Sequence, residues 1–222
     1  MTDFNGVYKF ISGPMVWIAF MVFLGGVIYK LWEMFSLVNK KEKFIYSYMS
    51  LKYSLRSILH WIIPFATTNW RKRPLLTVVT FLFHLSLVFM PIFLSAHVLL
   101  FQNAWGIRWW MLPDAVSDAL TVIVIIGSGF FLFRRMIKRE VRYLTALSDY
   151  VVLAIAVAPF ITGFLAYHQY LNYRFMLSIH ILSGEIMLMA IPFSRLSHMI
   201  YSVFTRAYLG SEFGGVRHAR DW

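Results

Sequence analysis

Long apolar runs separated by polar segments dominate the chain. Five of these runs are long enough to cross a bilayer, because about 20 apolar residues of helix span its hydrocarbon core. The sequence therefore predicts an all-α integral membrane protein, a five-helix transmembrane bundle forming a single membrane domain over residues 1–222. The predicted spans cover residues 13–37, 75–101, 114–133, 147–168 and 174–203.

The composition agrees with a membrane class. Hydrophobic residues make up 59% of the 222 residues and charged residues 14%, whereas a soluble domain carries about 25% charged residues. The chain has no cysteine, which excludes disulfides, thiolate-bound zinc, cysteine-held iron–sulfur clusters and covalently attached haem. Any metal or redox cofactor would therefore be held by His, Met, Asp or Glu.

Lys and Arg are distributed unevenly between the two sides of the predicted bundle. Sixteen lie in the 38–74 loop, the 134–146 loop and the 204–222 tail, against three (Lys9, Arg108 and Arg174) on the other side. Because basic loops stay in the cytoplasm, the N-terminus is predicted outside and the C-terminus inside. If the protein is bacterial, this places it in the inner membrane with its N-terminus in the periplasm. The net charge of +11 thus indicates cytoplasmic loops and not nucleic-acid binding.

The 38–74 loop is long enough to hold structure of its own. Its residues 44–65 mix aromatic and aliphatic side chains with Lys and Arg and contain no long apolar run. This pattern is typical of an amphipathic helix that lies in the membrane interface. We expect such a helix at the cytoplasmic surface, between the first two spans.

Four of the seven histidines lie inside two predicted spans: His84 and His97 in the second, His180 and His198 in the fifth. Ionisable residues inside a span are costly and are functional by default. The two spans run in opposite directions, so His84 and His198 share an inner depth and His97 and His180 an outer depth. Two imidazoles at one depth can ligate a haem iron from both sides, which predicts two haem b groups.

The angular positions of the histidines around the helix axis support the pairing in the fifth span better than in the second. His180 and His198 are 18 residues apart, so they face one way on a single straight helix. His84 and His97 are 13 residues apart, and a straight helix would point them in different directions, so a kink at Pro91 is expected between them. Packing or pore-lining histidines, a proton relay and a His-ligated metal ion remain alternatives.

Further candidate residues lie near the predicted haems. His168 ends the fourth span on the outer side and is an alternative outer ligand or part of a quinone site. Glu185, inside the fifth span, is a second candidate for the quinone site or for proton transfer. Three arginines are candidates to pair with haem propionates: Arg195, Arg108 and Arg174.

The end of the fifth span, Pro192-Phe193-Ser194-Arg195-Leu196-Ser197-His198, resembles the corresponding ending of the cytochrome b gamma subunit of respiratory nitrate reductase. Leu82-Phe83-His84 is similar to the first haem-ligand motif of that family. The longer gap between the second-span histidines and the run Phe93-Leu94-Ser95-Ala96-His97 look more like the small cytochrome b subunits of sulfate reducers. Those belong to the high-molecular-weight cytochrome c complex and the type I tetrahaem cytochrome c₃ complex.

The resemblance implies an electron-transfer subunit of an oxidoreductase complex, active in sulfate respiration. Its expected partners are a periplasmic multihaem cytochrome c, a cytoplasmic iron–sulfur subunit related to heterodisulfide reductase, other membrane subunits and the lipid bilayer. One alternative is a cytochrome b subunit that oxidises quinol or reduces quinone, with bound menaquinone. A second alternative is a haem-free membrane anchor or transporter.

Overall fold

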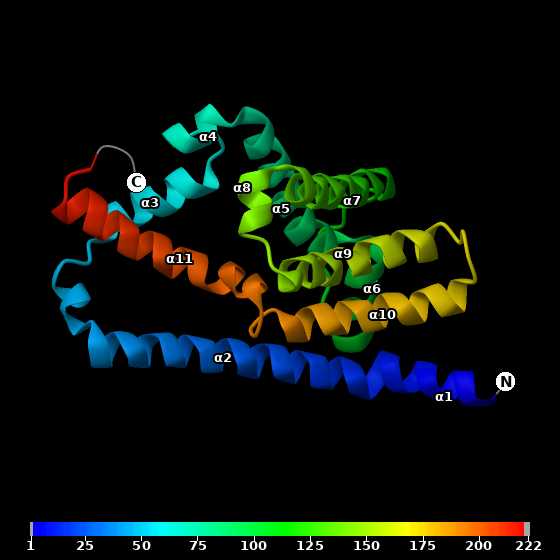
Figure 1. The fold of residues 1–222 in the computed structure, drawn as a ribbon. Coiled ribbons are helices and arrows are strands. Elements are labelled where there is room, and N and C mark those ends of the chain that lie inside the picture. The colour runs from blue at the N-terminus through cyan, green and yellow to red at the C-terminus, as the bar shows by residue number, and fades with distance from the viewer. Residues whose placement is uncertain (1, 220–222) are drawn as a thin grey trace. The chain divides into compact units, whose positions relative to one another are not determined.

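The computed structural model describes residues 2–219, which form helices and connecting turns with no strand among them (Figure 1). The long helices are α2 (Val16–Lys41), α5 (Pro74–Phe93), α7 (Asp114–Ile137), α9 (Leu147–Tyr167) and α10 (Tyr173–Ala190). The shorter segments are α1 (Thr2–Phe10), η1 (Ile11–Met15), η2 (Lys43–Ser47), α3 (Leu51–Ile62), α4 (Thr68–Lys72), α6 (Ser95–Trp105), α8 (Arg139–Tyr143), η3 (Arg195–Ser197), α11 (His198–Leu209) and η4 (Gly210–Val216).

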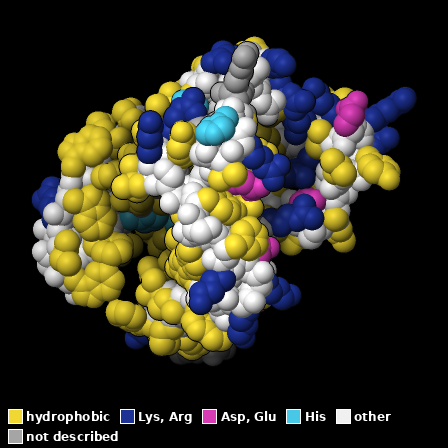
Figure 2. Space-filling model, turned by 90° about the vertical axis from the view of Figure 1, so that its left-hand side faces the viewer, with side chains coloured by type: hydrophobic (Ala, Val, Ile, Leu, Met, Phe, Trp, Pro, Cys, Tyr) yellow, Lys and Arg dark blue, Asp and Glu magenta, His cyan; other side chains and the backbone are white. Residues whose placement is uncertain are grey.

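Four helical stretches are apolar and long enough to cross a membrane: Asn5–Lys41, Pro74–Trp105, Asp114–Ile137 and Leu147–Tyr167. A fifth exists if α10 and the helical stretch Arg195–Val216, bent by 70° from it, count as one span. Apolar side chains also cover much of the face seen in Figure 2, as lipid-facing surfaces do. The all-helical fold is therefore confirmed, and its four or five candidate spans are those expected of a multi-pass membrane protein.

The predicted span over residues 174–203 is interrupted. Helix α10 ends at Ala190, and the chain turns before it resumes at Arg195. Pro192 lies in this turn and has no N–H to continue the helical ladder, while the Ser194 hydroxyl accepts a hydrogen bond from the Leu196 N–H and caps the next helical turn. His180 and His198 therefore lie on different helices, and the prediction that one straight helix aligns them is wrong.

The second predicted span, residues 75–101, is also broken. Helix α5 continues through Pro91 to Phe93, and α6 starts at Ser95. The break is at Leu94, whose backbone is extended. The expected disruption thus exists, but it lies three residues after the proline.

The chain divides into two compact units. One contains the chain up to Ser12 and Val79–Met187, and the other contains Gly13–Val78 and the chain from Leu188 on. In the first, α7 packs along α9. The core there consists of Phe83, Met90, Val124 and Phe160, with Leu87, Leu94, Leu120, Ile125 and Phe131 packed around it.

In the second unit, α3 lies side by side with α11 and η4 (Figure 1). Small buried residues make this approach possible: Ser54 and Ser57 on α3, and Gly210 and Ser211 at the start of η4. The Ser54 and Ser211 hydroxyls are 3.1 Å apart, within hydrogen-bonding distance. A Cβ on Gly210 would stand 2.6 Å from the Ser57 Cβ, so only glycine fits there.

Candidate functional site

The break between α5 and α6 positions His97. A helix leaves its last carbonyls without helical donors, and they need other hydrogen bonds inside a membrane. His97 Nδ1 lies 2.7 Å from the carbonyl oxygen of Pro91, one of these groups. The imidazole thus replaces a lost backbone donor, and its orientation is fixed by the helix end itself.

Two further N–H groups donate hydrogen bonds to carbonyls at the same end of α5. Trp109 Nε1 donates to the Ile92 carbonyl at 2.9 Å, and the Leu112 N–H donates to the Phe93 carbonyl at 2.8 Å. Both donors come from the segment between α6 and α7. The three carbonyls of the α5 terminus are therefore all hydrogen-bonded, which stabilises the break beside His97.

His180 is held against α9 in a similar way. Its Nδ1 lies 2.8 Å from the carbonyl oxygen of Pro159. The ring rests on Gly163, where an added Cβ would stand 2.9 Å from the imidazole Nδ1 and Cε1. Glycine at this position therefore gives the ring the room that its hydrogen bond requires.

The two imidazoles face each other across a short gap. The ring centroids of His97 and His180 are 6.0 Å apart, and the ring planes are inclined by 22°. Imidazoles that bind one metal ion from opposite sides, with metal–nitrogen distances of about 2.0 Å, have centroids about 6 Å apart. A hydrogen bond from Nδ1 to a carbonyl keeps Nε2 as the metal-binding atom, as in metal sites generally.

Two glycines of the long helices differ in what surrounds them. Gly184 lies four residues after His180, so both project on one side of α10. A Cβ on Gly184 would meet no atom within 4 Å, whereas one on Gly127 would stand 3.0 Å from the Phe83 ring. Gly127 thus serves helix packing, and Gly184 borders space that no atom of the chain occupies within 4 Å.

The inner pair of predicted ligands lies in two different units. His84 belongs to the unit of Val79–Met187 and His198 to the unit that resumes at Leu188. His84 Nδ1 lies 2.8 Å from the Thr80 carbonyl oxygen, and His198 Nδ1 lies 2.8 Å from that of Arg195. Each therefore has the carbonyl contact that also orients His97 and His180.

His168 follows the end of α9 and lies beside Asp118 of α7. Its Nε2 is 3.2 Å from a carboxylate oxygen of Asp118 on α7. Rings of Phe164, Tyr167 and Tyr170 surround it, with centroids 4.4, 5.2 and 5.5 Å away. The structure thus brings the alternative outer ligand to a carboxylate in an aromatic setting.

The remaining candidates differ in their environment. Glu185 is buried, with 4% of its surface exposed, and neither carboxylate oxygen has a hydrogen-bond partner among residues 2–219. Arg108, Arg174 and Arg195 are exposed. Within the described residues no three His, Cys, Asp or Glu side chains gather as a metal-ion site.

The sequence was compared with protein-family models and with known proteins. No protein-family model matches the chain. A protein of the sulfate reducer Nitratidesulfovibrio vulgaris, strain Hildenborough, is 37% identical over 211 residues, which make up 93% of each chain. The chain belongs to the family of this protein. The match extends over nearly all of the sequence, so the family shares the whole helical chain and not one span.

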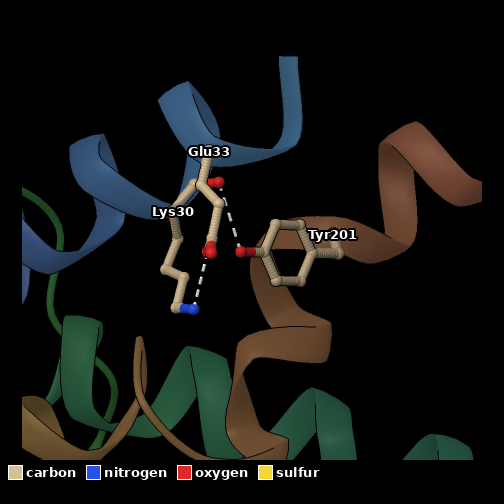
Figure 3. A network of polar contacts seen from close by, with 3 residues as sticks. All are labelled: Lys30, Glu33 and Tyr201. Atoms are coloured by element: carbon tan, nitrogen blue, oxygen red, sulfur yellow. Dashed lines mark hydrogen bonds and ion pairs between the residues drawn. The ribbon is translucent and has the colours of Figure 1, made fainter. Parts of the chain in front are cut away.

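One polar cluster was missed at the sequence level. Lys30 Nζ lies 2.7 Å from Glu33 Oε2 on α2, and the Tyr201 hydroxyl donates to the Lys30 carbonyl at 3.3 Å (Figure 3). The sequence did contain a signal for this ion pair, because Lys30 and Glu33 are one helical turn apart in an otherwise apolar run. The cluster joins α2 to α11 within one unit.

Proposed function

We propose that this chain is a dihaem b-type cytochrome subunit of a respiratory membrane complex. It would carry electrons across the inner membrane between a periplasmic multihaem cytochrome c and a cytoplasmic iron–sulfur subunit. The observation that carries the proposal is the pair His97 and His180, with ring centroids 6.0 Å apart and Nδ1 of each against a helix carbonyl. The centroid separation and the carbonyl contacts of Nδ1 agree with bis-histidine ligation of one iron.

The outer haem would be held by His97 and His180, and the inner haem by His84 and His198. Bound haem supplies a one-electron redox centre that the side chains of this chain lack. The histidines hold the iron, and the carbonyl contacts of their Nδ1 atoms make the rings more basic ligands. His97 and His180 are half-buried among apolar helices, whereas His84 and His198 are exposed. Arg108, Arg174 and Arg195 are proposed to pair with propionates.

The charge distribution supports an orientation and a set of partners. Sixteen Lys and Arg on one side against three on the other support an N-terminus outside and a C-terminus in the cytoplasm. Helix α3 exposes an apolar stripe of Leu51, Leu55, Leu59 and Ile62, which supports an interfacial position in the cytoplasmic leaflet. With no cysteine, iron–sulfur clusters must belong to partner subunits.

The deciding experiment is spectroscopic. The purified protein should show a b-type band in its reduced-minus-oxidised spectrum and two haems per chain by the pyridine haemochrome method. Reduced multihaem cytochrome c should reduce both haems in reconstituted vesicles. A pure, folded protein without a b-type band would instead be the haem-free anchor or transporter.

A second candidate function is quinol oxidation at the outer side. The His168–Asp118 contact of 3.2 Å favours it, because a histidine beside a carboxylate can accept a proton from a quinol hydroxyl. The surrounding aromatic rings would pack against a quinone ring. If this function holds, a menaquinol analogue reduces the haems, and His168→Ala slows that reaction by roughly 100-fold without changing reduction by dithionite. A wild-type protein inert to the analogue eliminates this candidate.

A further inference from the structure

Helix α3 turns its apolar stripe outward and not into its own unit. Leu51 is 75% exposed, Leu55 50% and Leu59 54%. They recur every fourth residue, so they lie along one side of the helix. The residues that α3 buries are instead Ser54 and Ser57, which face α11 and η4. The serine side is therefore the side that contacts the protein, and the apolar stripe is left for another partner to cover.

Cations accompany this stripe, and the segment that contains it has no acid. Residues 43–74 include six Lys and Arg and no Asp or Glu. All six are exposed: Lys43, Lys52, Arg56, Arg71, Lys72 and Arg73. Lys52 and Arg56 lie on α3 itself, where helical spacing places them beside the leucines and away from the buried serines. The segment thus presents a positive surface next to exposed apolar side chains.

Exposed aromatic side chains occur on the same segment. Phe44 is 63% exposed, Tyr46 49% and Trp61 36%. Aromatic rings of this kind are enriched where a membrane meets water, and aliphatic, aromatic and basic side chains together are typical of interfacial helices. The cores of protein–protein interfaces are instead depleted of charged residues such as Lys. The combination on α3 therefore favours a lipid surface over a protein partner.

We propose that α3 and the basic residues beside it bind anionic phospholipids of the cytoplasmic leaflet. The apolar stripe inserts among the acyl chains, and Lys52 and Arg56 extend to the lipid phosphates. Zwitterionic lipids carry an ammonium or choline that offsets the phosphate, so lipids with a net negative charge are preferred. The Ser54 hydroxyl holds α3 on α11 and η4, so the surface is formed in the folded chain. This inference rests on the membrane orientation in the proposed function and is independent of haem.

The test uses the full chain, which has no cysteine. Leu59→Cys therefore accepts a single bimane fluorophore on the apolar stripe. In vesicles of phosphatidylcholine and phosphatidylglycerol, brominated forms of both lipids should quench this label, and brominated phosphatidylglycerol should quench it more. Lys52→Gln and Arg56→Gln should each lower the relative affinity for phosphatidylglycerol by up to about fivefold. Lys138→Gln with Arg139→Gln removes two exposed cations where α7 meets α8, and should keep the original preference at the label.

Two results overturn the proposal directly. One is equal quenching by the two brominated lipids, and the other is an unchanged preference after Lys52→Gln and Arg56→Gln together. A label that neither lipid quenches also overturns it, because the stripe would then be left for a protein partner. If Leu59→Cys does not fold, Leu55→Cys carries the label, since Leu55 is exposed on the same stripe. Failure of the proposed function is distinguishable, because the b-type band is recorded on the same sample and does not depend on the lipid preference.

Discussion

Replacing His180 with alanine should lower the haem content from two per chain to one. The same result is expected for His97→Ala, because the two imidazoles lie 6.0 Å apart and an iron between them depends on both. The pyridine haemochrome method gives the haem count. The reduced-minus-oxidised amplitude should fall by about half, and both variants should lose the same component of the potentiometric titration.

His168→Ala is the matched control for this pair. It also removes an outer histidine, but one that lies against Asp118, so two haems should remain. Helical circular dichroism and a single elution peak would show that each variant is folded. Loss of a haem in His168→Ala, together with two haems in His97→Ala, would transfer the outer ligand from α6 to the end of α9.

The spans were the most predictable part of the fold. Helices α7 and α9 begin at Asp114 and Leu147, as the sequence predicts, because apolar length and flanking polar residues mark these boundaries directly. Helix α9 ends at Tyr167, one residue before the predicted end, whereas α7 continues past residue 133 to Ile137. A helix does not end where the apolar run ends, since Arg134 and Arg135 are themselves good helix formers.

Helix breaks were harder to predict because they depend on tertiary partners. Pro91 is tolerated inside α5, and the break occurs at Leu94, where Trp109 and Leu112 satisfy the terminal carbonyls. Those donors lie many residues away in sequence, so no local pattern identifies them. The break after Ala190 likewise invalidates a phase calculation that assumed a continuous helix up to His198.

The candidate site also has a part that the sequence predicts and a part that depends on tertiary contacts. Matching depths were enough to pair His97 with His180, because depth depends only on residue number and helix direction. Their orientation depends on the carbonyls of Pro91 and Pro159 and on the missing side chain of Gly163, which only the folded chain brings together. Glycine in an apolar span usually means helix packing, so the contact of Gly163 with the His180 ring could not be predicted from the sequence.

Gly163→Ala should weaken haem binding at the outer pair without removing either ligand. A Cβ at this position would stand 2.9 Å from two atoms of the His180 ring, so the imidazole must move away from α9. That movement stretches the 2.8 Å contact from Nδ1 to the Pro159 carbonyl and misaligns Nε2 with His97. Losing an orienting contact of a metal ligand typically costs roughly 10–100-fold in affinity, and we expect a loss of that size for the outer haem.

Haem titration of the apo protein, followed by the Soret band, measures this loss, and the inner haem serves as the internal reference. Gly6→Ala is the matched control, since a Cβ on this exposed glycine of α1 meets no atom within 4 Å and should leave both affinities unchanged. Because His180 itself is retained, Gly163→Ala tests the packing of the ring and not the identity of the ligand. Wild-type affinity at both haems in this variant would mean that the contact between Gly163 and His180 does not position the iron ligand.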